Sequence, residues 1–178
     1  AIARGHERWP ALLVANHVFG GGGFTSRLMS EVREKRGLVY GVGSGFSPMS
    51  AQGPFRIQLQ TRGDQAEQAI DIVRRELERF IEQGPTESEV SDAIRNISGS
   101  FPLRIDSNSD LMGYLSMMGF YELPTDYLAS YRERIEAVDA EAARAAFAEV
   151  LGGEPLVQVV VGGSRARAEG GAPAGDGG

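Results

Sequence analysis

Apolar residues repeat at helical spacing through most of the chain from residue 64 to residue 151, and this pattern limits the fold more than any other feature. The clearest case is the segment 64–83, whose apolar stripe ends at Gly84-Pro85. Thr86 follows as a helix cap, and Glu89 completes a capping box. The same spacing predicts helices over 86–101, over 106–120, from about 125 to 138, and from Asp139 to Leu151. The fold must therefore be rich in helix.

Only three segments have the pattern of a β-strand. In 38–48 every second residue from 41 to 45 is glycine, so one face of that strand carries almost no side chain. In 55–60 apolar and polar residues alternate, and the short connection predicts an antiparallel hairpin. The continuous apolar run 156–161 predicts a buried strand. The fold class is therefore α+β, with a mostly antiparallel sheet packed against several helices.

Three strands make a thin sheet. One more strand, before residue 1 or from a partner chain, would complete it.

The first residue is Ala rather than Met, so we expect a processed or truncated piece of a longer protein. The segment 164–178 is rich in Gly, Ala and Arg without an apolar period, and we expect it to be disordered.

Two helices are predicted near the N-terminus, with the four-glycine run Gly20–Gly23 between them. The first covers about 10–19 and is largely apolar. The second covers about 26–36, and Gly37 stands where a left-handed C-terminal cap is expected. The glycine run is therefore a break between two ordered elements.

Composition excludes several classes of site. The 178 residues suffice for one domain, and they include no cysteine, which excludes disulfides, thiolate zinc sites and iron–sulfur clusters. Only His6 and His17 are present, so a histidine-rich metal site cannot come from this chain alone. The net charge of −6 argues against general nucleic-acid binding. No apolar run approaches the roughly 20 residues that a membrane-spanning helix needs.

The glycine-rich segments do not match the common nucleotide-binding motifs. Gly20–Gly23 lack the Lys-Ser/Thr ending of a phosphate loop, and residues 41–46 end in Phe46 rather than in the last glycine of a dinucleotide fingerprint. The simplest interpretation is a flexible loop followed by a strand. A bare strand face also allows another backbone to approach closely, as an extended peptide would.

Arg33 and Tyr40 form the most specific candidate pair. Seven residues and the turn at Gly37 separate them, and that turn can bring the guanidinium and the phenol to one edge. Both groups donate hydrogen bonds and could hold a substrate carbonyl or carboxylate. The alternative is that Arg33 only complements a helix dipole and Tyr40 belongs to the core.

Residues 20–40, which read GGGGFTSRLMSEVREKRGLVY, resemble the C-terminal domain of the insulinase-like (pitrilysin) zinc metallopeptidases. That family includes the mitochondrial processing peptidases and their bacterial relatives. The segments 99–104 (GSFPLR) and 119–124 (GFYELP) also resemble bacterial members. The resemblance covers about residues 4–163.

The resemblance implies one half of a two-domain α+β fold, spanning 1–163 with its leading strand missing. In that family the homologous N-terminal half carries the zinc motif His-x-x-Glu-His, which this chain lacks. Zinc is thus expected in a missing half or a partner subunit, and no catalytic residue or metal ligand is assigned here. Arg33 and Tyr40 match the two positions that contact substrate near the cleaved bond, and we expect the loop Gly20–Gly23 with Phe24 close to the substrate.

The implied function is that of a substrate-binding, chamber-closing domain of a zinc peptidase that cleaves extended peptides and is not catalytic alone. Two alternatives share the fold: a metal-free partner subunit, and a non-proteolytic assembly module like the core subunits of a respiratory complex. An unrelated α+β protein that binds an anionic small molecule at the glycine loop is a third. The resemblance also implies the periplasm, with the cytoplasm as the alternative.

Overall fold

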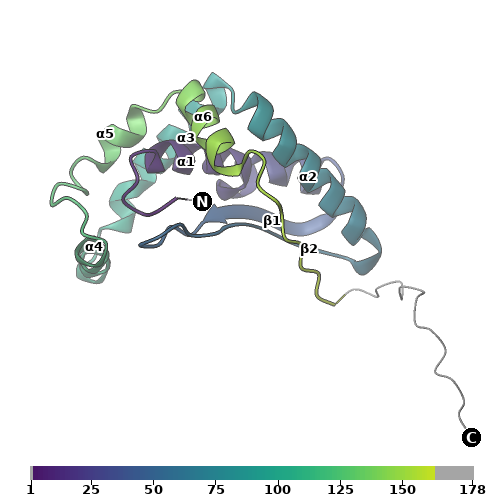
Figure 1. The fold of residues 1–178 in the computed structure, drawn as a ribbon, viewed down its shortest axis with the longest axis horizontal. Coiled ribbons are helices and arrows are strands. Elements are labelled where there is room, and N and C mark those ends of the chain that lie inside the picture. Colours follow the sequence, from purple (N-terminus) through teal and green to yellow (C-terminus); the bar gives the residue numbers. More distant parts are fainter. Residues whose placement is uncertain (1, 163–178) are drawn as a thin grey trace, which may run out of the picture.

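The computed structural model describes residues 2–162, which form a layer of helices over one face of a two-stranded antiparallel sheet (Figure 1). The predicted α+β class is confirmed. The strands are β1 (Val39–Phe46) and β2 (Phe55–Thr61), and the α-helices are α1 (Trp9–Asn16), α2 (Ala66–Gln83), α3 (Glu87–Ser100), α4 (Asn108–Phe120), α5 (Tyr131–Glu136) and α6 (Ala140–Leu151). Within the described range no helix is long and apolar enough to cross a membrane.

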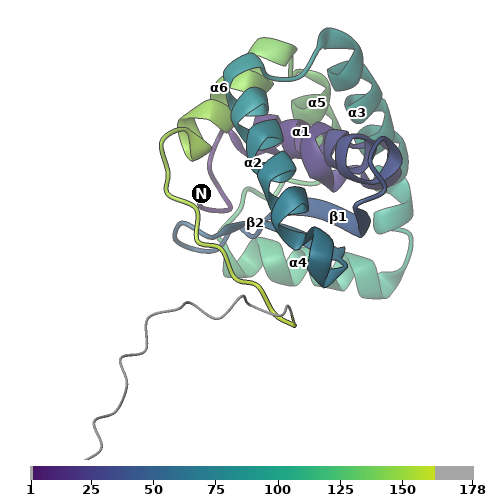
Figure 2. The ribbon, with the colours of Figure 1, turned by 90° about the vertical axis from the view of Figure 1, so that its right-hand side faces the viewer.

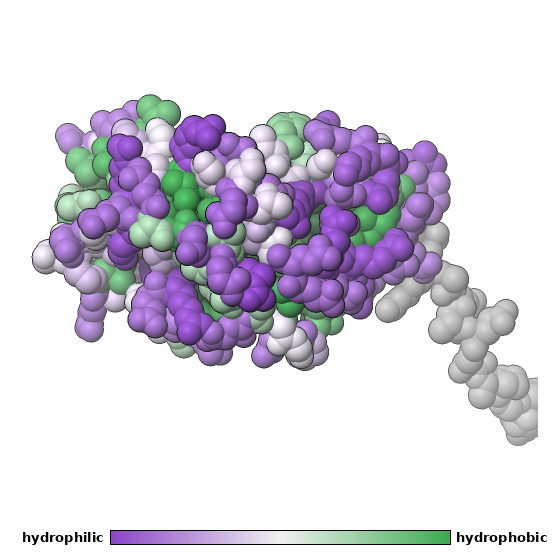
Figure 3. All heavy atoms as spheres, turned by 90° about the horizontal axis from the view of Figure 1, so that it is seen from above, coloured by the Kyte–Doolittle hydropathy of each residue, from purple (hydrophilic) through white to green (hydrophobic). Residues whose placement is uncertain are grey.

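Helices α1, α2 and α3 lie on the same side of the hairpin, whereas α4 lies at its level (Figures 1 and 2). The surface on the helical side is mostly hydrophilic, as expected for helices that turn one face to the core and one to water (Figure 3). The opposite face of the hairpin is left open by the described elements (Figure 1).

The register of the hairpin decides which side chains face the helices. Val42 pairs with Leu59, and Phe46 with Phe55, and all four pack on the core. The alternate positions of β2 are exposed and polar. The ladder contains an irregularity between Val39 and Gly41, so the residue between them has no partner of its own.

Five phenylalanines connect the helices to the sheet. Phe147 of α6 is fully buried, and its ring centroid lies 4.9 Å from that of Phe80 and 5.6 Å from that of Phe19. It also meets Phe46 and Phe55 of the hairpin, at 6.0 and 5.8 Å. This cluster fixes the helical layer against the sheet.

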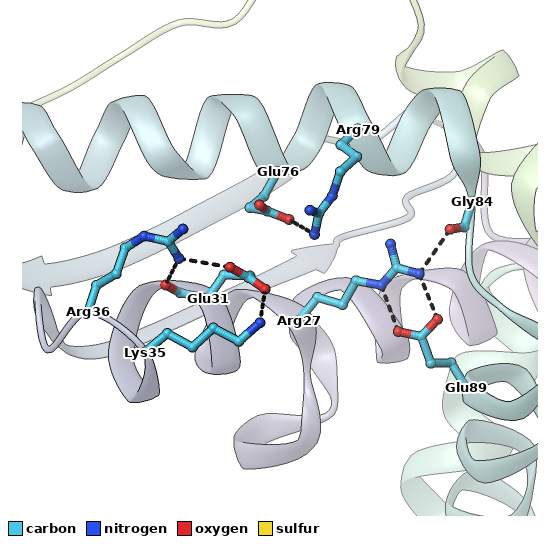
Figure 4. A network of polar contacts seen from close by, with 8 residues as sticks. All are labelled: Arg27, Glu31, Lys35, Arg36, Glu76, Arg79, Gly84 and Glu89. Atoms are coloured by element: carbon cyan, nitrogen blue, oxygen red, sulfur yellow. Dashed lines mark hydrogen bonds and ion pairs between the residues drawn. The ribbon is translucent and has the colours of Figure 1, made fainter.

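The predicted capping box is confirmed at the start of α3, where the Thr86 hydroxyl accepts from the Glu89 backbone N–H at 3.3 Å. Glu89 also accepts from Arg27 Nε at 2.7 Å and Nη2 at 2.6 Å, and the same Nη2 donates to the Gly84 carbonyl (Figure 4). Burial raises the pKa of Glu89, but the hydrogen bonds from Arg27 and Thr86 outweigh it and lower this pKa to about 2. The carboxylate therefore ties the α2–α3 turn to the segment after the glycine loop.

We expect Glu89→Gln to lower the free energy of unfolding at pH 7 by about 1–2 kcal/mol, a value that allows for solvent screening of a partly exposed pair. Because the folded-state pKa lies below the ordinary 4.5, this stabilisation is complete above about pH 4.5 and disappears as the pH falls toward 2. Urea unfolding of both proteins between pH 3 and 7 checks this. A difference between the two proteins that stays constant with pH would refute it.

Four predicted elements differ from the structure. The prediction of a buried strand over 156–161 is wrong, because this segment lies outside any strand and Val157 is 91% exposed. The helix predicted from about 125 is shorter, because residues 125–130 form turns before α5. The helices predicted over 10–19 and 26–36 contain π-helical turns at His17–Gly21 and Met29–Glu34.

The absence of strand pairing at 156–161 has a physical explanation. A strand is stable only when its backbone N–H and C=O groups find partners on a neighbouring strand. Among the described residues the hairpin has no third strand. The segment 156–161 contacts α2 instead, where the Arg74 guanidinium donates to the Gln158 side-chain oxygen at 2.9 Å. The predicted missing strand and the domain limits 1–163 stay predictions. The tail 164–178 lies outside the described residues.

Candidate functional site

The glycine loop lies directly against β1. The Asn16 amide donates to the Ser44 carbonyl at 3.2 Å, and the Ser44 hydroxyl donates to Asn16 Oδ1 at 2.7 Å. A methyl group on Gly20 would come within 2.9 Å of the Ser44 backbone nitrogen and 2.8 Å of Leu28 Cδ1. Gly20 thus permits a close approach of the first helix to the strand that any side chain would prevent.

Two hydroxyl groups hold the loop on its other side. The buried Ser26 donates to the Gly23 carbonyl at 2.7 Å, and Thr25 donates to the Gly22 carbonyl at 3.1 Å. Gly23 has a φ of +63°, a conformation that glycine adopts without strain. The run interpreted as a flexible break is therefore an ordered loop with fixed contacts.

Arg33 and Tyr40 line the same hollow, of about 490 Å³, at the start of β1. Arg33 belongs to the π-helical segment Met29–Glu34, and its guanidinium lies 5.0 Å from the centre of the Phe24 ring. Gly37, with a φ of +63°, reverses the chain between the two residues. The predicted turn therefore brings Arg33 and Tyr40 to one place.

Tyr40 is the unpaired residue at the irregularity of β1, and its side chain is 75% exposed. A bulge of this kind turns a side chain away from the regular alternation of the strand, and bulges are common beside active sites. The alternative role of Tyr40 in the core is excluded by its exposure. Glu34, Arg62 and Gln65 complete the polar wall of this hollow.

A second hollow, of about 560 Å³, lies over the open face of the hairpin. Gly20, Gly21 and Gly23 line one side of it, so the glycine loop and the strand form a single surface. Its floor is β1 from Gly41 to Gly45. Its far wall is β2 with Arg56, Gln58 and Gln60, and no carboxylate residue belongs to the lining. The loop and the Arg33–Tyr40 pair thus belong to adjacent hollows along one strand.

The groups in these hollows are suited to binding. Neither lining contains a histidine, and the described residues hold no group of three His, Asp or Glu side chains that could bind a metal ion. His17 is half-buried outside both linings, and burial, followed by the positive charge of Arg104, lowers its pKa. Glu31 is held by Lys35 and Arg36 (Figure 4). What remains are donors for carbonyl and carboxylate oxygens, together with the carboxylate of Glu34 beside Arg33 and Tyr40.

Residues that the sequence analysis did not single out complete the site. Asn16 and Ser44 position the loop, and Arg56 provides the cation of the second hollow. Asn16 was a polar residue inside an apolar stretch, which is a detectable signal for a buried hydrogen-bonding group. Arg56 carried no signal beyond the alternation of its strand.

Comparisons with known proteins agree with this picture. Residues 2–97 match the family described as the peptidase M16 inactive domain. The chain is 34% identical to an uncharacterized zinc protease of Streptomyces coelicolor over 89% of its own length and 34% of that protein. It is 32% identical to the non-peptidase homolog YmxG of Helicobacter pylori, over 65% of this chain and 27% of that protein.

A crystal structure of a peptidase M16 inactive domain from Pseudomonas fluorescens has a TM-score of 0.78 to this structure and 44% sequence identity. The match covers 83% of this chain and 35% of that one. The chain thus spans between about a quarter and a third of the length of the curated relatives described above.

Proposed function

The chain belongs to the peptidase M16 (pitrilysin) family as its non-catalytic, inactive domain, and from this premise we propose that it binds extended peptides and closes the substrate chamber of a zinc peptidase. The zinc-bearing half is a homologous domain or subunit. Residues 2–162 do not fit a zinc ion, because they contain no cluster of three His, Asp or Glu side chains that could hold one.

The observation that carries the proposal is the pairing of Arg33 with the exposed Tyr40 in one hollow. An exposed tyrosine on a strand irregularity has no role in the core, and Arg33 makes no ion pair with any residue from 2 to 162. Both side chains are thus available to donate to oxygens of a bound peptide. In the assembled enzyme they hold the substrate near the cleaved bond, while the other half supplies the hydrolytic chemistry.

Exposed apolar surface supports pairing with a second domain. Met112, Leu115 and Phe120 on α4 are 63%, 56% and 73% exposed, and the apolar segment 156–161 is exposed as well. Exposed apolar surface of this kind is typical of protein–protein interfaces. The greater length of the relatives agrees with a second domain. A periplasmic location stays a prediction from the family resemblance.

A non-proteolytic role, as a metal-free subunit or an assembly module, is the second candidate. It is favoured by one observation, the similarity to a relative described as a non-peptidase homolog. Under this alternative the two hollows have no peptide to bind, and the exposed α4 serves assembly.

Photo-crosslinking tests the proposal directly. With p-benzoylphenylalanine in place of Tyr40, ultraviolet light is expected to attach a bound peptide substrate to the protein. The same amino acid in place of Arg95, which is exposed on α3 and lines neither hollow, is the control. Crosslinking from position 40 alone supports substrate contact. Equal crosslinking from both positions, or none, would favour the assembly role.

A further inference from the structure

Gly41 and Gly45 occupy the open face of β1 without any internal reason to be glycine. Neither has a positive φ, and a methyl group on either would meet no described atom within 4 Å. Glycine inside a strand costs about 0.5–1 kcal/mol relative to Ala. Two such residues on one strand face therefore weaken the hairpin without improving its packing.

Other glycines of the same region differ in this respect. Gly20 and Gly53 would both place a methyl group into neighbouring backbone, and Gly43 would place one 3.3 Å from the Gly20 carbonyl oxygen. Their identity follows from the fold itself. The fold itself does not explain why residues 41 and 45 are glycine, so we look for the explanation in a binding partner. A strand face without side chains allows another chain to approach closely.

The wall beside this bare face is polar and carries one positive charge. Arg56 pairs with Gly45 across the ladder, and Gln58 pairs with Gly43. Arg56 is exposed and makes no ion pair within residues 2–162, although the whole chain has a net charge of −6. The hollow is thus locally cationic in an acidic protein.

We propose that this surface is a specificity site, in which an extended peptide lies flat on Gly41–Gly45 and an acidic side chain of the peptide pairs with Arg56. The inference rests on the proposed function and adds the chemistry of the preferred substrate. The amides of Gln58 and Gln60 provide donors and acceptors for the peptide backbone. The guanidinium selects a carboxylate because it binds that group in a bidentate manner.

The strand also sets the distance between this site and Tyr40. At about 3.4 Å per residue, Gly45 lies about 17 Å along β1 from Tyr40. An extended peptide that follows β1 has the same rise. The acidic residue is therefore expected four or five positions from the residue that contacts Tyr40.

Peptides with Glu or Gln at that position distinguish the proposal from nonspecific binding. Fluorescence anisotropy measures their affinities for the protein assembled with its zinc-bearing half, so the result does not depend on hydrolysis. We expect the Glu peptide to bind about fivefold more tightly. Arg56→Gln should abolish this preference, and Arg56→Glu should favour a Lys peptide. The control, Arg75→Gln on the outer face of α2, should leave the preference unchanged.

Gly45→Val separates a role of this glycine in peptide binding from a role in the stability of the fold. The variant is expected to melt at the same or a higher temperature and to bind the peptide about tenfold more weakly. Gly99→Ala, at an open position of α3, should affect stability alone. Equal binding of Glu and Gln peptides, a preference that survives Arg56→Gln, or undetectable peptide binding would overturn the specificity site. Absent hydrolysis with the acidic preference intact would overturn only the proposed peptidase role.

Discussion

Tyr40→Phe is expected to lower kcat/KM for peptide hydrolysis by the assembled enzyme about 100-fold, the usual cost of removing one donor that stabilises the reacting carbonyl. The side chain is 75% exposed, so the loss of the hydroxyl should leave the melting temperature unchanged. Arg33→Ala should have a comparable effect, because the guanidinium contacts the ring of Phe24 and lines the same hollow. Steady-state kinetics and thermal unfolding of the same preparations check both effects.

Matched variants separate a role in substrate contact from a structural one. Arg33→Lys keeps the charge but not the fork of donors, and should restore only part of the activity. Tyr114→Phe on α4 and Arg75→Ala on α2 remove the same groups elsewhere and should leave turnover unchanged. Full activity in both Tyr40→Phe and Arg33→Ala would exclude substrate contact. A loss of activity that follows a matching loss of stability would instead indicate a structural role.

Gly20→Ala is expected to lower the free energy of unfolding by about 2–3 kcal/mol, the upper range for forcing an extra group into a packed site. The new methyl group would lie 2.9 Å from the Ser44 backbone nitrogen, which belongs to β1 and cannot rotate away. The helix would have to move from the strand, and the bonds between Asn16 and Ser44 would break. Urea unfolding measures the loss of stability.

Gly41→Ala is the control for this effect, because a methyl group there meets no described atom within 4 Å. It should be neutral or slightly stabilising. If Gly20→Ala were as stable as Gly41→Ala, the loop would be loosely attached to β1. The ordered site described above would then be wrong in its most constrained part.

The sequence predicted the elements whose signals are local. Thr86 and Glu89 form the expected capping box because its partners are only three residues apart. The hairpin was predictable because β2 alternates between core and solvent. The segment 156–161 was misjudged because an apolar run indicates burial but does not provide a neighbouring strand. The π-helical turns depend on how the chain is packed, which periodicity does not reveal.

The residues of the candidate site also differ in whether their signals are local in the sequence. The spacing of Arg33 and Tyr40 around Gly37 made them a candidate pair, and the structure places both in one hollow because a single turn decides their position. Their role in substrate contact came from the family resemblance and stays a prediction. Arg56 was missed because its meaning depends on the cross-strand partner Gly45, and register is a property of two strands. The contact between Asn16 and Ser44 spans 28 residues and arises only in the folded chain.

The central claim is that this chain is the non-catalytic, substrate-binding half of a zinc peptidase. Its most direct test is peptide hydrolysis by this chain, by the zinc-bearing half, and by the two together, each with and without a chelator. We predict hydrolysis only when both halves are present, and its complete loss with the chelator. Chelator-resistant hydrolysis by this chain alone, or a zinc-bearing half as active alone as in the mixture, would contradict the claim.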